Sequence, residues 1–199
     1  MEFLIATNNK HKLEEYKEIL SPFNIDVLSL KDAGIVCNPE EDGLTFEDNS
    51  LIKAKECAKF TDKIILADDS GLIVDALPNI LGVQTSRFLG EDTPYPLKRL
   101  EVIKKLKNKD RTARFICCIT ILNLEKEPLV FKGECVGHIA YEPEGEEGFG
   151  YDPIFIPEGY DKTFASLGEE VKNQISHRGL ASKELVQYLK GKFNEDTTN

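Results

Sequence analysis

Short apolar runs alternate with segments of helical periodicity along the first third of this chain. Residues 3–6, 26–30 and 64–67 have the length and composition of buried strands. Apolar residues recur at helical spacing over residues 10–20 and from Thr45 to about Phe60, with charged residues between them. Strands that alternate with helices predict an α/β fold with helices packed on a central sheet.

Two long β-rich runs follow, at residues 112–124 and 129–140, and a short polar turn joins them. This spacing predicts an antiparallel hairpin, so the central sheet should be mixed. A glycine-rich acidic loop at residues 144–150 leads to a further short strand at residues 154–156.

Two further helices are predicted in the second half of the chain. The first should be capped by Asp92 or Thr93 and should bury the stripe Leu97, Leu100, Ile103 and Leu106. The last should span residues 180–189 and end at Gly191, after an irregular segment that follows Pro157.

An acidic turn is predicted directly after the strand at residues 64–67, at Asp68-Asp69-Ser70-Gly71. Neighbouring side chains on an extended chain point to opposite faces, so one carboxylate should face a ligand more directly than the other. Open α/β sheets bind ligands outside strand ends, although the same residues also make ordinary turns.

A second candidate site lies where the first strand passes into the first helix, at residues 8–12. Asn8 or Asn9 is a suitable N-cap, and Lys10 and Lys12 add positive charge beside exposed backbone N–H groups. Such a turn can bind an anion, while the alternative is a plain helix cap with solvated lysines.

Composition and charge narrow the possible functions of the 199-residue chain. The net charge of −10 argues against a nucleic-acid polymer as partner, but a small phosphorylated ligand remains possible with a basic pocket and a metal ion. No apolar run approaches the ~18 residues of a membrane span. The N-terminus lacks the features of a signal peptide, so we expect a cytoplasmic protein without membrane association.

We expect one two-lobed domain over residues 1–193, with a disordered tail at residues 194–199. The five cysteines are odd in number and contain no Cys-x-x-Cys pair, which favours reduced, buried thiols over disulfides or a zinc site.

The candidate chemical groups complement one another. Carboxylates at Glu40-Glu41 and Asp68-Asp69 suit Mg²⁺, and lysines and arginines bind phosphate oxygens. An aromatic ring in the loop near Phe149 could stack on a base. Together these groups indicate a nucleoside-phosphate hydrolase that uses metal-assisted attack by water.

An ordered set of motifs resembles the inosine triphosphate pyrophosphatase family. The motifs lie at residues 6–15, 41–46, 67–72, 82–87, 148–153 and 175–179. The resemblance implies hydrolysis of ITP, dITP and XTP to the monophosphate and pyrophosphate, with Mg²⁺, by a homodimer. It also implies two lobes around a long mixed sheet, with the active site in the cleft between the lobes.

The resemblance assigns roles to individual residues around the phosphates. The triphosphate would be cradled by Thr7, Asn8, Asn9, Lys10, His11 and Lys12, with Lys12 as the main cation. Glu40 and Asp69 would hold the metal, with Glu41 as an alternative to Glu40. Asp69 would also be the general base, while Asp68 would support it and Ser70 would contact the phosphates.

The base would lie against the C-terminal motifs. Phe149 would stack on the purine within the segment that also contains Gly150 and Tyr151. Its polar edge would be surrounded by Asp152, His177 and Arg178, with Lys172 also reaching the ligand. Donors from His177 and Arg178 would favour a 6-oxo group over a 6-amino group, and buried hydrogen bonding of this kind can discriminate by roughly 10⁴-fold.

Two other functions use the same residues. A phosphatase could release orthophosphate from nucleotides with these carboxylates and lysines. A binding module could keep the pocket without turnover, but a protein that only binds polyanions gains little from the Asp68-Asp69 pair without a metal.

Overall fold

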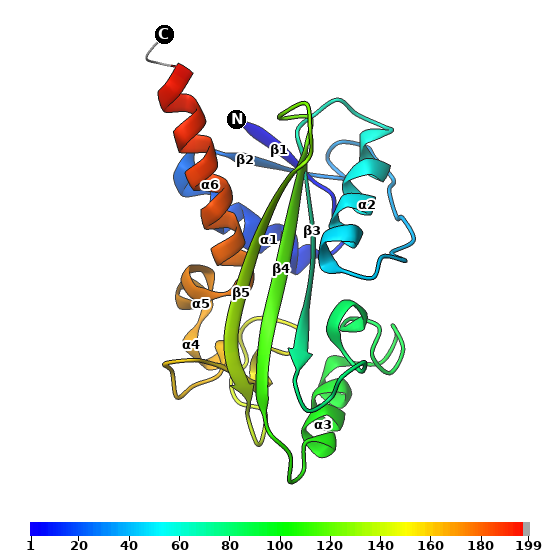
Figure 1. The fold of residues 1–199 in the computed structure, drawn as a ribbon, viewed down its shortest axis with the longest axis vertical. Helices are drawn as coiled ribbons and strands as arrows, with labels where there is room; N and C mark the ends of the chain where they lie inside the picture. Colours follow the sequence, from blue (N-terminus) through cyan, green and yellow to red (C-terminus); the bar gives the residue numbers. More distant parts are fainter. Residues whose placement is uncertain (197–199) are drawn as a thin grey trace. The chain divides into compact units, whose positions relative to one another are not determined.

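The computed structural model describes residues 1–196, and its strands form a six-stranded sheet in the order β2-β1-β3-β4-β5-β6 (Figure 1). β1 pairs in parallel with β2 and with β3, whereas β5 pairs antiparallel with β6, so the predicted mixed sheet is confirmed. The strands are β1 (Glu2–Ile5), β2 (Asp26–Ser29), β3 (Ile65–Val74), β4 (Thr112–Leu122), β5 (Leu129–Ile139) and β6 (Phe155–Pro157).

β3 differs from the expectation at its acidic residues, because the predicted turn at Asp68-Asp69-Ser70-Gly71 is absent and the strand continues to Val74. Alternation along the strand puts Asp68 on the same face as Leu66, and Asp69 on the same face as Ala67. Leu66 and Ala67 belong to two different hydrophobic clusters, which confirms that the neighbouring carboxylates face opposite sides. Long-range ion pairs, described below, stabilise the extended conformation against the local turn preference.

The chain divides into two compact units, and three strands run through both. The first unit comprises Met1–Asp69, Cys117–Gly133 and the segment from Arg178 onward. The second comprises Ser70–Ile116 and Glu134–His177.

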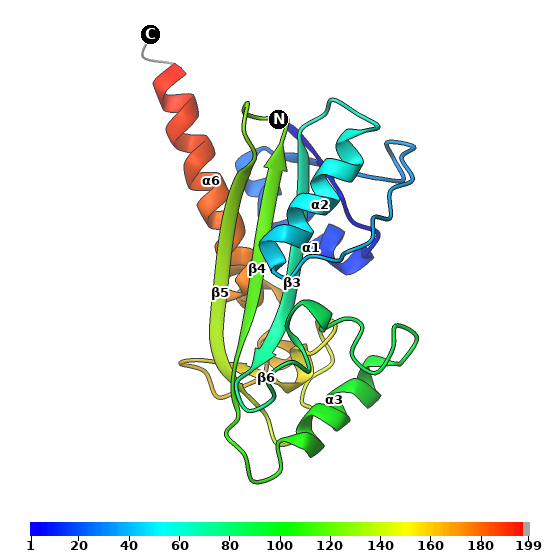
Figure 2. The same ribbon diagram turned by 45° about the vertical axis from the view of Figure 1, so that its right-hand side comes forward.

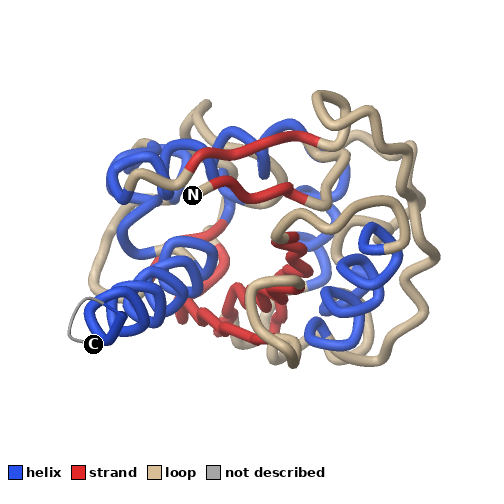
Figure 3. The backbone as a smooth tube through the Cα atoms, turned by 90° about the horizontal axis from the view of Figure 1, so that it is seen from above, coloured by secondary structure: helices blue, strands red, loops and turns tan. Residues whose placement is uncertain are grey.

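Helices cover both faces of the strands in the first unit. α1 (Lys10–Leu20) and α6 (His177–Asp196) pack on the face that contains Leu66, through residues such as Tyr16 and Leu185. α2 (Phe46–Ala58) packs on the opposite face through Ala54 and Cys57. α2 and α6 lie on different sides of the strands in Figure 2, and Figure 3 shows α6 from above.

α2 begins with the capping box that the sequence predicts. Asp48 N donates to Thr45 Oγ1 over 3.0 Å, and Thr45 N donates to Asp48 Oδ2 over 3.2 Å. These two bonds satisfy N–H groups that the helix itself cannot pair. The fixed start of α2 determines which of its residues face β3.

The second unit has its own core, centred on Phe115, Phe155 and Phe164. The segment predicted to be irregular after Pro157 instead contains two short helices. Thr163 caps the first through a bond from Ser166 N, and Gly168 at φ 85° separates them. The helical elements of this unit are η2 (Gly82–Gln84), α3 (Tyr95–Lys105), η3 (Asp152–Ile154), α4 (Phe164–Leu167) and α5 (Glu169–Ile175); η1 (Ser21–Phe23) lies in the first unit.

The predicted buried stripe of α3 is only half right. Leu106 is buried and Ile103 packs on the core, but Leu97 and Leu100 are 55% and 54% exposed. Lys98 and Val102 take the inward positions, and the N-cap is Pro94 rather than Asp92 or Thr93. Lys98 Nζ donates to Ser86 O over 2.5 Å, a long-range bond that apolar periodicity does not reveal.

α6 begins at His177, earlier than predicted, and passes through Gly191 instead of ending there. Its backbone at Gly191 lies outside the left-handed region that helix-ending glycines use. The helix includes residues 194–196 of the predicted tail, and residues 197–199 lie outside the described part of the chain.

All five cysteines are buried and free in the structure, as predicted for structural thiols. No helix within residues 1–196 is long and apolar enough to span a membrane.

The continuation of α6 predicts that Gly191→Ala stabilises the protein. A Cβ atom at Gly191 would meet no atom within 4 Å, and alanine favours a helix over glycine by about 0.5–1 kcal/mol. Chemical denaturation should show a free energy of unfolding higher by that amount. A lower value would mean that Gly191 is a helix terminator after all.

Gly145→Ala is the matched control. Gly145 has φ 84°, and a Cβ atom there would lie 2.4 Å from the carbonyl carbon of Ala165. This variant should lose at least ~1 kcal/mol of stability in the same assay.

Candidate functional site

Asp68 is the centre of a buried ionic cluster in the first unit. Lys12 Nζ lies 3.1 Å from Asp68 Oδ1 and 3.0 Å from Oδ2, and Arg178 Nη2 donates to Oδ2 over 3.0 Å. Arg178 Nη1 also donates to Glu15 Oε2. α1 supplies Lys12 and Glu15, and α6 supplies Arg178, so three elements meet at this carboxylate.

The charges of this cluster determine its protonation. Burial raises the pKa of Asp68, but Lys12 and then Arg178 outweigh burial and hold that pKa well below its ordinary value. Burial lowers the pKa of Arg178, while Glu15 and Asp68 more than compensate and raise it. Asp68 is therefore a permanent carboxylate at neutral pH and a poor proton acceptor.

Asp69 has different partners on the other face of β3. Lys53 Nζ lies 3.1 Å from Asp69 Oδ1, and Asn49 Nδ2 donates to Oδ2 over 3.2 Å. Lys53 Nζ is also 3.4 Å from Glu41 Oε2. Asn49 and Lys53 are one helical turn apart in α2 and so share a face.

The pKa of Asp69 is raised, in contrast to that of Asp68. Burial is the largest cause, Lys53 and Lys12 act against it, and Glu41 raises the pKa further. Burial lowers the pKa of Lys53, but Asp69, Asp68 and Glu41 raise it overall, so the lysine stays charged. A buried carboxylate with a raised pKa is the better general base of the pair.

Sequence reasoning missed Asn49, Lys53 and Glu15 as members of these clusters. A signal existed for Asn49 and Lys53, because they are polar residues at the helical phase that faces the sheet in α2. Glu15 lies at the end of the motif at residues 6–15, but α1 has several charged residues along its length, so its position in the helix did not single it out.

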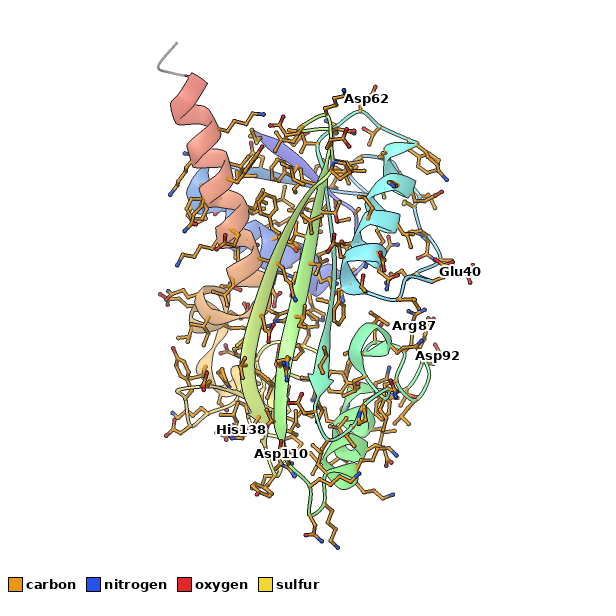
Figure 4. The ribbon with its side chains drawn as sticks, viewed as in Figure 1. Glu40, Asp62, Arg87, Asp92, Asp110 and His138 are labelled. Carbon is orange, nitrogen blue, oxygen red and sulfur yellow. The ribbon has the colours of Figure 1, made fainter. Side chains whose placement is uncertain are left out.

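The carboxylates can be tested for their fit to a divalent cation. Glu40 is exposed on the loop before α2 (Figure 4). The carboxylates of Glu41 and Asp69, in contrast, both form an ion pair with Lys53 Nζ. Within the described residues, no three His, Cys, Asp or Glu side chains gather to hold a metal. Two hard oxygen donors still fit Mg²⁺, which takes its other ligands from water and phosphate.

The turn before α1 forms the predicted helix cap. Asn9 Oδ1 accepts from His11 N over 2.9 Å and from Lys12 N over 3.3 Å, and Asn9 N donates to Thr7 Oγ1 over 3.1 Å. The Asn8 side chain donates to Cys37 O over 3.1 Å. Asn9 therefore already occupies backbone donors that a phosphate would use, while Lys10 and His11 are exposed.

The second unit brings together three of the predicted base-contacting residues. Asp152 Oδ2 accepts from Phe149 N over 2.8 Å and from Lys172 Nζ over 2.7 Å. Lys172 Nζ also lies 4.8 Å from the centre of the Phe149 ring. A Cβ atom at Gly148, which has φ 74°, would lie 2.3 Å from Asp152 Oδ2, so this close approach requires glycine.

Other predicted residues of this unit include Tyr151, His177 and Ser70. Tyr151 is buried in the core and donates from its hydroxyl to Thr85 O over 3.1 Å. The buried His177 ring stacks on Phe115, with ring centres 4.6 Å apart and planes at 11°. Ser70 is half-buried in β3.

Comparison with known proteins shows the family of this chain. A family model described as the Ham1 family matches residues 3–188. The chain belongs to the Ham1 family.

Curated relatives in this family match nearly the whole chain. A dITP/XTP pyrophosphatase of Clostridium perfringens is 46% identical over 198 residues, which cover 95% of this chain and 97% of the relative. A dITP/XTP pyrophosphatase of Bacillus subtilis is 44% identical and covers 94% of this chain and 96% of its own length.

Solved structures of Ham1 proteins share the fold. The Staphylococcus aureus Ham1 protein has a TM-score of 0.85 and 39% identity, covering 96% of this chain and all of the other. A HAM1 protein from Coxiella burnetii also has a TM-score of 0.85, at 37% identity, and covers 96% and 99% of the two chains.

The Asp68 cluster predicts a large loss of stability for Asp68→Asn. Removing one charge from a buried ion network leaves its partners uncompensated, which costs about 3–5 kcal/mol. Because the folded pKa lies below the unfolded value, the carboxylate stabilises the protein above about pH 4, and this contribution disappears as pH falls through the folded pKa. Denaturation at several pH values should show the deficit of the variant shrinking below about pH 4.

Asp75→Asn is the matched control for this measurement. Asp75 pairs with Arg114 at 2.7 Å, but both side chains are more than a third exposed. Surface pairs contribute about 0–1 kcal/mol. Equal losses in the two variants would contradict a special role for the buried cluster.

Proposed function

We propose that this Ham1-family chain hydrolyses non-standard purine nucleoside triphosphates (ITP, dITP and XTP) to the nucleoside monophosphate and pyrophosphate. The observation that carries the proposal is Asp69, a buried carboxylate with a raised pKa that lies beside the ammonium group of Lys53. The relatives from Clostridium perfringens and Bacillus subtilis are named dITP/XTP pyrophosphatases, which supports the same reaction.

The reaction breaks the anhydride bond between the α- and β-phosphates. Asp69 accepts a proton from the attacking water, whose oxygen bonds to the α-phosphorus while pyrophosphate leaves. Lys53 and Asn49 hold the Asp69 carboxylate from two sides, which fixes the direction in which it accepts that proton. Lys12 is anchored on Asp68 and supplies positive charge for phosphate oxygens.

We propose that the carboxylates of Asp69 and Glu41 bind Mg²⁺. Glu40, on the exposed loop, stays a predicted alternative ligand. When bound, Mg²⁺ would polarise the phosphates and neutralise their charge.

Phe149 is the ring that we propose to stack on the purine. The Lys172 ammonium lies over this ring, 4.8 Å from its centre, and we propose it as a donor to the polar edge of the purine. A 6-oxo group accepts hydrogen bonds from donors of the protein, whereas the N–H groups of a 6-amino group would face those donors without forming a hydrogen bond. His177 and Arg178 remain the proposed donors to the 6-oxo group of the base. We also propose that the protein works as a cytoplasmic homodimer.

The decisive experiment identifies products from a panel of ITP, dITP, XTP, GTP and ATP with Mg²⁺. We expect pyrophosphate and monophosphate from the first three, at rates far above those for ATP. The Asp69→Asn variant should still bind nucleotide but should turn over at least ~10²-fold more slowly, the usual scale for a general base. Orthophosphate as the product would indicate a phosphatase, and binding without any product would indicate a binding module.

The ion pair between Lys53 and Asp69 predicts that replacing Lys53 shifts the pH dependence of the reaction. Asp69 must be ionised to act as a base, and Lys53 is the strongest group that lowers its raised pKa. In Lys53→Met the pKa of Asp69 should rise further, so the acidic limb of kcat/KM should move to higher pH. Lys53→Arg keeps the charge and should leave the limb in place. A limb that stays fixed in both variants would show that Asp69 is not the titrating base.

A further inference from the structure

α3 presents polar residues, rather than the predicted leucines, to the interior of the second unit. Tyr95, Lys98 and Arg99 lie at positions i, i+3 and i+4, so they share one face of the helix, defined here as the inner face of α3. Leu97 and Leu100 point outward on the same helix. Each residue of the inner face contacts a loop that the sequence motifs single out.

Arg99 makes the most direct of these contacts. Its Nε donates to Gly150 O over 2.6 Å, and Gly150 directly follows the proposed base-stacking residue Phe149. Lys98 Nζ binds Ser86 O, and the Tyr95 ring meets the Tyr151 ring edge-on, with centres 5.4 Å apart. α3 therefore holds residues 150–151 from one side.

The base loop, residues 148–152, needs such external contacts because its own backbone is permissive. Gly148 and Gly150 have φ 74° and 62°, conformations in which glycine has little steric preference. Asp152 fixes the loop at one point, through Phe149 N and Lys172. Arg99 fixes it at a second point, the carbonyl of Gly150.

Charge supports this second contact. Burial lowers the pKa of Arg99, and the Asp152 carboxylate acts in the opposite direction. The two side chains therefore interact electrostatically across the loop. A charged donor on a carbonyl oxygen makes a stronger hydrogen bond than a neutral one.

We propose that Arg99 is a positioning residue that holds the base loop, and thereby the Phe149 ring, in the conformation that binds a purine. The proposal rests on the proposed function for its choice of substrate. Arg99 does not touch reacting groups in this scheme, so its loss should weaken binding of the base while leaving the bond-breaking step unchanged.

The test compares Arg99→Met with Arg114→Met, a control in which an arginine of the same unit loses its surface pair with Asp75. We expect KM for ITP to rise about tenfold in R99M, the scale of one lost charged hydrogen bond, with kcat within about twofold of wild type. Inhibition by inorganic tripolyphosphate, which has no base, should not change. R114M should match wild type, and Arg99→Lys should recover part of the lost affinity.

Hydrogen exchange without nucleotide provides an independent readout. The amides of residues 148–152 should exchange faster in R99M than in wild type or R114M. Unchanged exchange, an unchanged KM, or a fall in kcat alone would each overturn the proposal. If R99M does not fold, Arg99→Gln carries the same expectations.

These readouts separate the positioning role from the proposed function. If wild-type protein hydrolyses none of the non-standard purine triphosphates, the proposed function fails, but exchange in the base loop still decides whether Arg99 holds it. If the substrates are hydrolysed and the loop exchange does not respond to R99M, only the role of Arg99 fails.

Discussion

Two neighbouring carboxylates on one continuous strand impose the main constraint on the first unit. Asp68 and Asp69 must point to opposite faces of β3, and both are buried. A buried charge is costly unless it is paired, so each face needs its own cation from a different helix. α1 and α6 supply Lys12 and Arg178 on one side, while α2 supplies Lys53 on the other.

This constraint also divides the chemical roles of the pair. Lys12 and Arg178 pair directly with Asp68 and hold its pKa low, whereas Lys53 and Lys12 together do not overcome the effect of burial on the pKa of Asp69. Environments that move two pKa values apart are a recurrent way to assign acid–base roles. Asp68 thus anchors Lys12, and Asp69 is the better proton acceptor of the two carboxylates.

Local pattern predicted most of the strands and the caps of α1 and α2, because these depend on residues close in sequence. The hairpin spacing of residues 112–140 predicted the mixed sheet. Local pattern failed at Asp68-Asp69, where turn preference yields to ion pairs with α1, α2 and α6. It also failed at α3, where Lys98 finds a carbonyl partner in a distant loop. The partners Asn49 and Lys53 were missed for the same reason: their importance depends on a strand that follows later in the chain.

The charges around Asp68 and Asp69 bear on the proposed divalent cation. Ion pairs join the carboxylates of Glu15, Glu41, Asp68 and Asp69 to the cations Lys12, Lys53 and Arg178. Carboxylates beside a phosphate site oppose the approach of a triphosphate. Mg²⁺ bound to Glu41 and Asp69 would offset that repulsion and add ligand positions for phosphate oxygens. Glu41 thus has two roles in the proposed site: it raises the pKa of Asp69 further, and with Asp69 it would supply the oxygen ligands for the metal ion.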